Sequence, residues 1–113
     1  MAWSLERTYD YYNRKYFGNE LPKIPVQWSE VISDYAVYEQ PSDDSDGLIR
    51  ISSETRKFNS VWRMSLLHEM CHVKLREYPE EIAAKSRTPR SHSNIWQKEM
   101  MRLAQAGAFK TLW

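Results

Sequence analysis

The sequence contains only one cysteine and three glycines, and it has no long apolar run. A single thiol, Cys71, cannot form an internal disulfide, which is compatible with a reducing compartment. No apolar segment approaches the roughly 20 residues of a membrane-spanning helix, and the N-terminus lacks the basic and apolar regions of a secretory signal. We therefore expect a cytoplasmic protein, or a nuclear one in a eukaryote, without membrane contact.

Acidic residues are sparse in the second part of the chain, where no aspartate follows Asp46. Residues 1–47 contain four Lys/Arg and nine Asp/Glu, whereas residues 48–113 contain twelve and six. The formal net charge of +1 therefore hides an acidic first part and a basic second part. A basic surface can attract an acidic substrate or nucleic acid, although interspersed charges of this kind are more often a solvated surface.

The length of 113 residues leaves room for one hydrophobic core, so we predict a single, monomeric domain over residues 1–113. Apolar periodicity predicts an α+β fold: an N-terminal helix, a small three-stranded sheet, a long central helix and a C-terminal helix. The expected helices run from the Ser4 cap to Gly18, from Asn59 or Ser60 to about Glu77 with Pro79 marking the end, and from Ser91 or Ser93 to about Gly107. The expected strands lie within 24–28, 34–39 and 48–52, with a charged connector over 80–90 and a docked tail over 108–113.

Histidine is also rare, and all three copies fall where one metal ion could hold them. In the run His68-Glu69-Met70-Cys71-His72, the two histidines share one face of the predicted central helix, with Cβ atoms roughly 5–6 Å apart. Glu69 lies about 100° further round the helix, beside both imidazoles rather than between them. A carboxylate in this position is suited to act as a general base for a metal-bound water.

A two-histidine motif occurs by chance, so a third ligand must support it. The metzincin extension needs Gly and His three and six residues after the second histidine, but Leu75 and Tyr78 stand there. An aspartate ligand is excluded because none follows Asp46, whereas Glu99 and Glu80 remain possible.

His92 is the preferred third ligand, because it lies in or just before the first turn of the last predicted helix. Trp96, Met100 and Leu103 give that helix an apolar face, which would hold His92 firmly against the core.

A bound zinc ion could instead be structural, which would require a fourth protein ligand. Cys71 is the only thiol available, and its place about 60° from His68 around the helix makes chelation awkward but not impossible. Periodicity assigns Cys71 to the core instead. One alternative to a zinc peptidase is therefore a non-catalytic module that zinc stabilises and that binds DNA or protein. A second alternative is a zinc hydrolase that acts on non-peptide amides.

Three segments resemble the SprT-like metalloproteases, and the resemblance covers nearly the whole chain. Residues 11–22 resemble the family's entry segment, residues 66–72 its zinc helix, and residues 91–96 the place where the family has a histidine that opens a helix. Members often have glycine on either side of that histidine, whereas this chain has Ser91 and Ser93, which lack glycine's freedom at positive φ. The sequence also contains neither the C-terminal zinc ribbon of many bacterial members nor the DNA-binding extensions of eukaryotic ones.

The resemblance implies a minimal zincin-like domain in which His68, His72 and His92 hold Zn²⁺ and Glu69 takes a proton from the attacking water. Protein or peptide is the implied substrate, and DNA association is implied only weakly. We expect an extended substrate to pair with an exposed strand edge near residues 34–39. The candidates for stabilising the oxyanion are Tyr35, Tyr38 and Tyr78, and those for contacting phosphates are Lys85, Arg87, Arg90 and Arg102.

Overall fold

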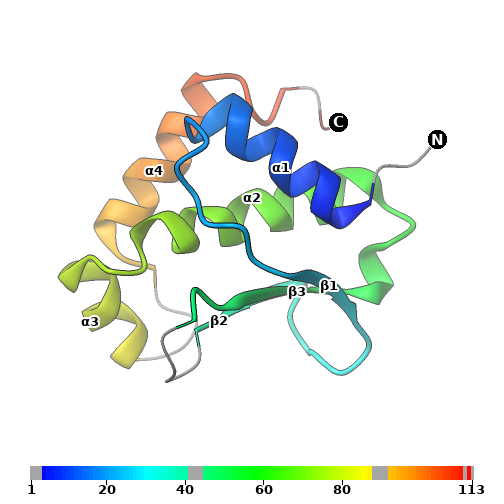
Figure 1. Ribbon diagram of the computed structural model, residues 1–113, viewed down its shortest axis with the longest axis horizontal. Coiled ribbons are helices and arrows are strands. Elements are labelled where there is room, and N and C mark those ends of the chain that lie inside the picture. The colour runs from blue at the N-terminus through cyan, green and yellow to red at the C-terminus, as the bar shows by residue number, and fades with distance from the viewer. Residues whose placement is uncertain (1–3, 41–44, 88–91, 111, 113) are drawn as a thin grey trace.

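The computed structural model describes residues 4–40, 45–87, 92–110 and 112, and within them the fold is α+β, as the sequence predicts (Figure 1). The helices are α1 (Leu5–Tyr16), α2 (Asn59–Leu75), α3 (Pro79–Arg87) and α4 (Asn94–Gln105), with a 3-10 turn, η1, at Ser53–Thr55. The strands are β1 (Val26–Ser29), β2 (Ala36–Glu39) and β3 (Leu48–Ser52). Helix α2 lies in the middle, with the sheet on one side and α1 and α4 on the other.

The sheet has the order β1-β3-β2, so β2 is an outer strand. β1 pairs parallel to β3, with Val26 opposite Ile49, and β2 pairs antiparallel to β3, with Tyr38 opposite Ile49. Ile49 is fully buried, because β3 is the central strand and packs against α2. The consequence for the site is that one edge of β2 is not covered by another strand of this sheet.

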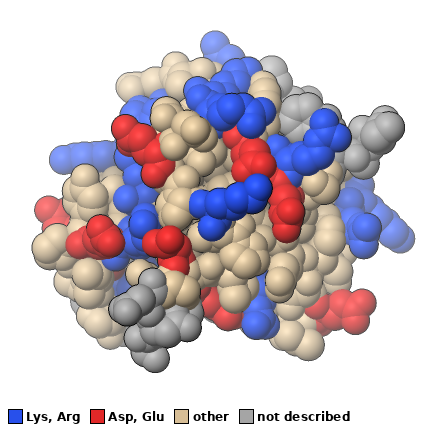
Figure 2. Space-filling view, in the orientation of Figure 1, with Lys and Arg blue, Asp and Glu red and all other residues tan. Residues whose placement is uncertain are grey.

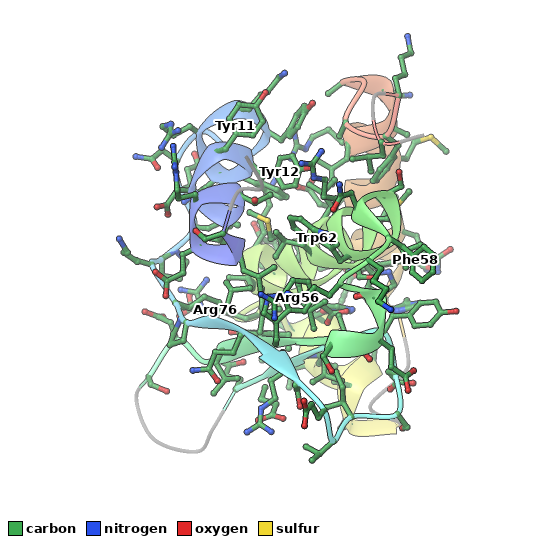
Figure 3. All side chains as sticks on the ribbon, turned by 90° about the vertical axis from the view of Figure 1, so that its right-hand side faces the viewer. Tyr11, Tyr12, Arg56, Phe58, Trp62 and Arg76 are labelled. Atoms are coloured by element: carbon green, nitrogen blue, oxygen red, sulfur yellow. The ribbon has the colours of Figure 1, made fainter. Side chains whose placement is uncertain are left out.

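The core gathers around α2. Leu66, Leu67, Met70, Cys71 and Val73 are all fully buried there. Seen from the end, Tyr12 of α1 and Trp62 of α2 point into the interior, whereas Phe58 lies on the outside (Figure 3).

The tail packs on the core where it is described, since Ala108 and Leu112 are buried, while residues 111 and 113 lie outside the described part.

The helix starts follow the predicted caps in two cases and differ in one. Ser4 accepts a hydrogen bond from the Arg7 amide (3.1 Å) and caps α1, and Ser93 caps α4 in the same way. The alternative cap Ser91 lies outside the described residues. At α2 the prediction was wrong, because Phe58 is the N-cap residue and Asn59 already lies in the helix. The side chain of Asn59 accepts a hydrogen bond from the Trp62 indole (3.1 Å) instead of capping.

Helix α3 was missed by the sequence reasoning, which assigned residues 80–90 to a charged connector. Pro79 begins this helix rather than only marking the end of α2. The reason is local: proline is tolerated in the first helical turn, and Glu80 and Glu81 favour the positive end of the helix dipole. Glu81 and Ala84 form the buried side of α3, and this short face carries no apolar stripe that periodicity could detect.

No helix in the described ranges is long and apolar enough to cross a membrane.

Figure 2 shows Lys/Arg and Asp/Glu side chains interspersed over one face of the molecule, in keeping with a solvated surface on that face.

Candidate metal centre

Two helices bring the three histidines together. His68 and His72 project from α2 with ring centroids 5.6 Å apart, and His92 lies two residues before the start of α4. The ligand atoms of the three side chains all lie within 4.8 Å of one another, and Nε2 of His68 is 3.1 Å from Nε2 of His92. Within the described part of the chain, this is the one group of three or more potential metal ligands.

The distance between the ligand nitrogens of His68 and His92 fits a tetrahedral zinc ion. Zinc–imidazole bonds of about 2.0–2.1 Å place neighbouring ligand nitrogens roughly 3.3 Å apart. The observed 3.1 Å between His68 and His92 is close to that value, and three nitrogens leave one position for water or substrate. The three histidines could therefore hold a zinc ion.

The protonation of the imidazoles also suits metal binding. Burial, followed by the neighbouring His72 and His92, lowers the pKa of His68 to about 4. The pKa of His92 is lowered as well, first by burial and then by His72. At neutral pH both rings are therefore uncharged, which is the form that binds zinc.

Glu69 lies beside the cluster, with Oε2 3.8 Å from Nε2 of His68 and only 7% of its surface exposed. Burial raises its pKa to about 7, although the charge of Lys85 and a hydrogen bond from the Tyr38 backbone oppose this shift. A carboxyl group with a pKa near the working pH is suited to accept and return a proton. The place beside the ligands matches the one expected from the helix geometry.

The carboxylate of Glu81, on α3, is a partner of His72 that sequence reasoning missed. It pairs with Nδ1 of His72 and accepts a hydrogen bond from the Ser93 hydroxyl (2.7 Å), and it is almost fully buried. Burial alone would raise the pKa of Glu81, but these two hydrogen bonds hold it below the ordinary value. An ionised carboxylate only accepts, so Nδ1 of His72 carries the proton and Nε2 is free to bind metal.

Ser93, which stands where the SprT-like pattern often has glycine, has a defined structural role. Its φ of −70° is ordinary for a helix cap, and its Oγ accepts from the Trp96 amide (3.1 Å) while donating to Glu81. The serine therefore links the cap of α4 to the group that orients His72.

Trp96 contacts two candidate ligands, whereas the sequence indicated only an apolar helix face that would hold His92 against the core. Its ring stacks on His92 at 3.9 Å between centroids with an interplanar angle of 13°. Its indole Nε1 donates to the backbone oxygen of His68 (3.2 Å). An aromatic residue four positions after His92 was the only sequence signal for this contact.

The rival ligands lie elsewhere. Glu99 is held by Lys74 (2.9 Å) and by Arg102 (2.6 Å), so its carboxylate is engaged in ion pairs away from the histidines. Glu80 is exposed on α3. The Sγ atom of Cys71 is fully buried and faces Sδ of Met100 at 3.5 Å, as a core role predicts. None of these side chains belongs to the histidine group.

The histidines border a cleft of about 860 Å³. Its walls come from the segment 31–35, from all four residues of β2, from the side of α2 that carries the two histidines and Glu69, and from Lys85 of α3. The exposed Val31 and Tyr35 give one end of the cleft an apolar rim. The outer edge of β2 and the three candidate metal ligands thus belong to the same cleft.

Of the other predicted site residues, some line the cleft and others lie away from it. Tyr35 and Tyr38 line the cleft, but the Tyr38 hydroxyl donates to the Asp46 carbonyl (2.5 Å), and Tyr78 lies on the surface away from the cleft-lining residues. Lys85 lines the cleft, whereas Arg102 binds Glu99. The side chain of Arg87 and the whole of Arg90 fall outside the described residues.

A pair of histidines on one helix, with an adjacent glutamate and a third histidine from the next element, forms a group that could hold one metal ion. The family model described as SprT-like family matches residues 5–111. The chain therefore belongs to the SprT-like family. A comparison with curated proteins found no match.

Proposed function

We propose that this protein is a zinc-dependent endopeptidase that hydrolyses peptide bonds in flexible or unfolded protein segments. The observation that carries the proposal is the convergence of three imidazoles and Glu69 in a cleft bordered by an outer strand. Membership in the SprT-like family supports the proposal.

The residues of the site divide the work. His68, His72 and His92 hold Zn²⁺, and the Glu81 carboxylate keeps His72 in the tautomer that presents Nε2. When bound, zinc polarises a substrate carbonyl and acidifies a coordinated water. Glu69 accepts the proton from water and delivers it to the leaving amine, because its raised pKa allows both transfers near neutral pH.

The substrate binds as an added strand. β2 is the outer strand next to the ligands, and its four residues line the cleft. Backbone hydrogen bonds to such an edge need an extended peptide, which a flexible or unfolded segment supplies at low cost. The exposed Val31 and Tyr35 at the rim add apolar contacts for substrate side chains.

DNA-associated proteins are one source of such segments, suggested by the basic second part of the chain. The second part of the chain is basic, but Figure 2 shows charges of both signs mixed on one face, and Arg102 is committed to Glu99. Direct phosphate binding therefore has no defined groove among the described residues.

One experiment tests the proposal against a non-catalytic module. The protein is loaded with one equivalent of zinc, its metal content is measured, and cleavage of a labelled unfolded protein is followed with and without single-stranded DNA. The matched control is Glu69→Gln, which should retain zinc and lose hydrolysis. Stoichiometric zinc without cleavage under either condition would favour the binding module, and cleavage by the Gln variant would remove Glu69 from the mechanism.

A further inference from the structure

Lys85 stands out among the described residues that line the cleft, because it is the only lysine or arginine there. It belongs to α3, on which Glu81 also lies. Its Nζ lies 4.9 Å from the ring centroid of Tyr38, over the face of the β2 tyrosine. A cation–π contact of this kind holds the ammonium group at the cleft wall without neutralising it.

The ammonium group is partly removed from water and has no carboxylate bonded to it among the described residues. By contrast, two cations at the C-terminal end of α2 form ion pairs: Lys74 bonds Glu99 (2.9 Å), and Arg76 bonds Asp46 (3.1 Å). The nearest acid on its own helix, Glu81, is already engaged by His72 and Ser93.

Lys85 lines the same cleft as Glu69 and His92. Burial lowers the pKa of Lys85, and Glu81 and Glu69 oppose that shift. Lys85, the candidate base Glu69 and the candidate third ligand His92 therefore border one cleft.

We infer that Lys85 binds an anionic oxygen of the peptide that lies along β2. This inference rests on the proposed endopeptidase function and names an electrophilic group for the same site. Two groups can supply this oxygen, and they share one chemistry: the oxyanion that develops on the scissile carbonyl, or the carboxylate of an acidic substrate side chain. A half-buried ammonium group interacts with either more strongly than it would in water.

The geometry favours Lys85 over the tyrosines for this role. The Tyr38 hydroxyl is engaged with Asp46, and Tyr35 is largely exposed at the rim. Lys85 has a long, flexible side chain and lines the cleft together with β2 and His92. A peptide paired with β2 passes within reach of its ammonium group.

The test compares Lys85→Met and Lys85→Arg with the matched control Lys98→Met, which changes an exposed lysine on α4. Zinc content is measured first. Then kcat and KM are determined on quenched-fluorescence peptides that differ only by Asp or Asn, placed on either side of the cleaved bond. Binding of the same peptides, and of a phosphinic peptide that mimics the tetrahedral intermediate, is measured on zinc-loaded Glu69→Gln with and without Lys85→Met.

Each source of the anionic oxygen gives its own result. If Lys85 stabilises the oxyanion, Lys85→Met lowers kcat about 100-fold on all peptides and weakens phosphinic-peptide binding, with KM little changed. If it binds a side chain, KM and the dissociation constant rise about fivefold or more for the Asp peptides alone. Lys85→Arg retains part of either effect, and Lys98→Met retains wild-type values.

Two results overturn the inference: unchanged constants on every peptide with zinc retained, or loss of zinc in Lys85→Met and Lys85→Arg alike, which would make Lys85 a support for the metal ligands. If zinc-loaded wild-type protein cleaves no peptide, the proposed function fails, and the binding measurements still decide the inference. A well-folded Lys85→Gln, checked by circular dichroism, replaces the Met variant if that variant does not fold.

Discussion

Glu81 and His72 are joined by a buried contact between a carboxylate of α3 and Nδ1 of an imidazole of α2. They are nine positions apart in the chain, and the turn between the two helices brings them together. The contact fixes which nitrogen of His72 faces the other two histidines.

The first prediction concerns this contact. Glu81→Gln should weaken zinc binding about 10- to 100-fold, because the amide cannot hold the His72 ring as an ionised carboxylate does. Competition with a chromogenic chelator measures the affinity. Glu80→Gln is the matched control, since Glu80 is exposed on the same helix turn, and it should bind zinc as the wild type does. Equal affinities for the two variants would show that Glu81 does not position His72.

The second prediction separates the candidate third ligands. His92→Ala should lose stoichiometric zinc, whereas Glu99→Ala should retain it. Glu99→Ala should instead lower the free energy of unfolding by about 1–3 kcal/mol, since it leaves Lys74 and Arg102 without their shared carboxylate. Metal analysis and urea unfolding of both variants give the two readouts. Release of zinc by Glu99→Ala but not by His92→Ala would reverse the assignment.

The third prediction is a pH dependence of the metal-free protein. The folded state raises the pKa of Glu69 from 4.5 to about 7, so the folded form holds a proton that the unfolded form has lost across this window. The Glu69 contribution to stability therefore falls as pH rises from 4.5 to 7, by a total on the order of 3 kcal/mol. Glu69→Gln removes this loss. With chelator present, the variant should gain stability over the wild type as pH rises through that window.

His68 works in the opposite direction in both proteins, because its pKa falls to about 4 and its contribution to stability grows as pH rises toward 6.5. Its effect cancels when the two proteins are compared at each pH. Urea unfolding at intervals from pH 4.5 to 7.5 measures the difference, and a constant difference across that range would contradict the raised pKa of Glu69.

The fourth prediction concerns Ser93, which caps α4 and also donates to Glu81. Ser93→Ala should lower the free energy of unfolding by about 1 kcal/mol through loss of the cap. It should also weaken zinc binding, while Ser93→Thr should preserve both properties because its hydroxyl can make the same two hydrogen bonds. A variant that loses stability without any change in zinc affinity would limit Ser93 to the cap.

Much of this arrangement could be predicted from local sequence patterns. The four-residue spacing of His68 and His72 predicts that they share one helix face. Ser93, next to His92, is a typical N-cap residue and predicts the start of α4. The strand at 48–52 was predicted with its observed bounds. Each of these features depends on neighbours within one element, which is what periodicity and capping report.

The parts that could not be predicted depend on contacts between elements. Helix α3 was hidden because its buried face consists largely of Glu81 and Ala84, which carry no apolar period. In the sequence, Glu81 cannot be distinguished from an acidic surface residue, because its contact with His72 depends on the turn between α2 and α3. Trp96 fits a core stripe, and only the packing of α4 on α2 shows that it also contacts His92 and His68.

The stacking of Trp96 on His92 gives the protein an internal optical reporter. Indole fluorescence is sensitive to an imidazole in contact with the ring, and a metal bound to that imidazole alters its electronic state. In a variant that keeps Trp96 and replaces the other four tryptophans with phenylalanine, the indole emission would report metal binding at the three histidines directly. Occupancy could then be read continuously, without a label, in the same cuvette in which a substrate is being cleaved.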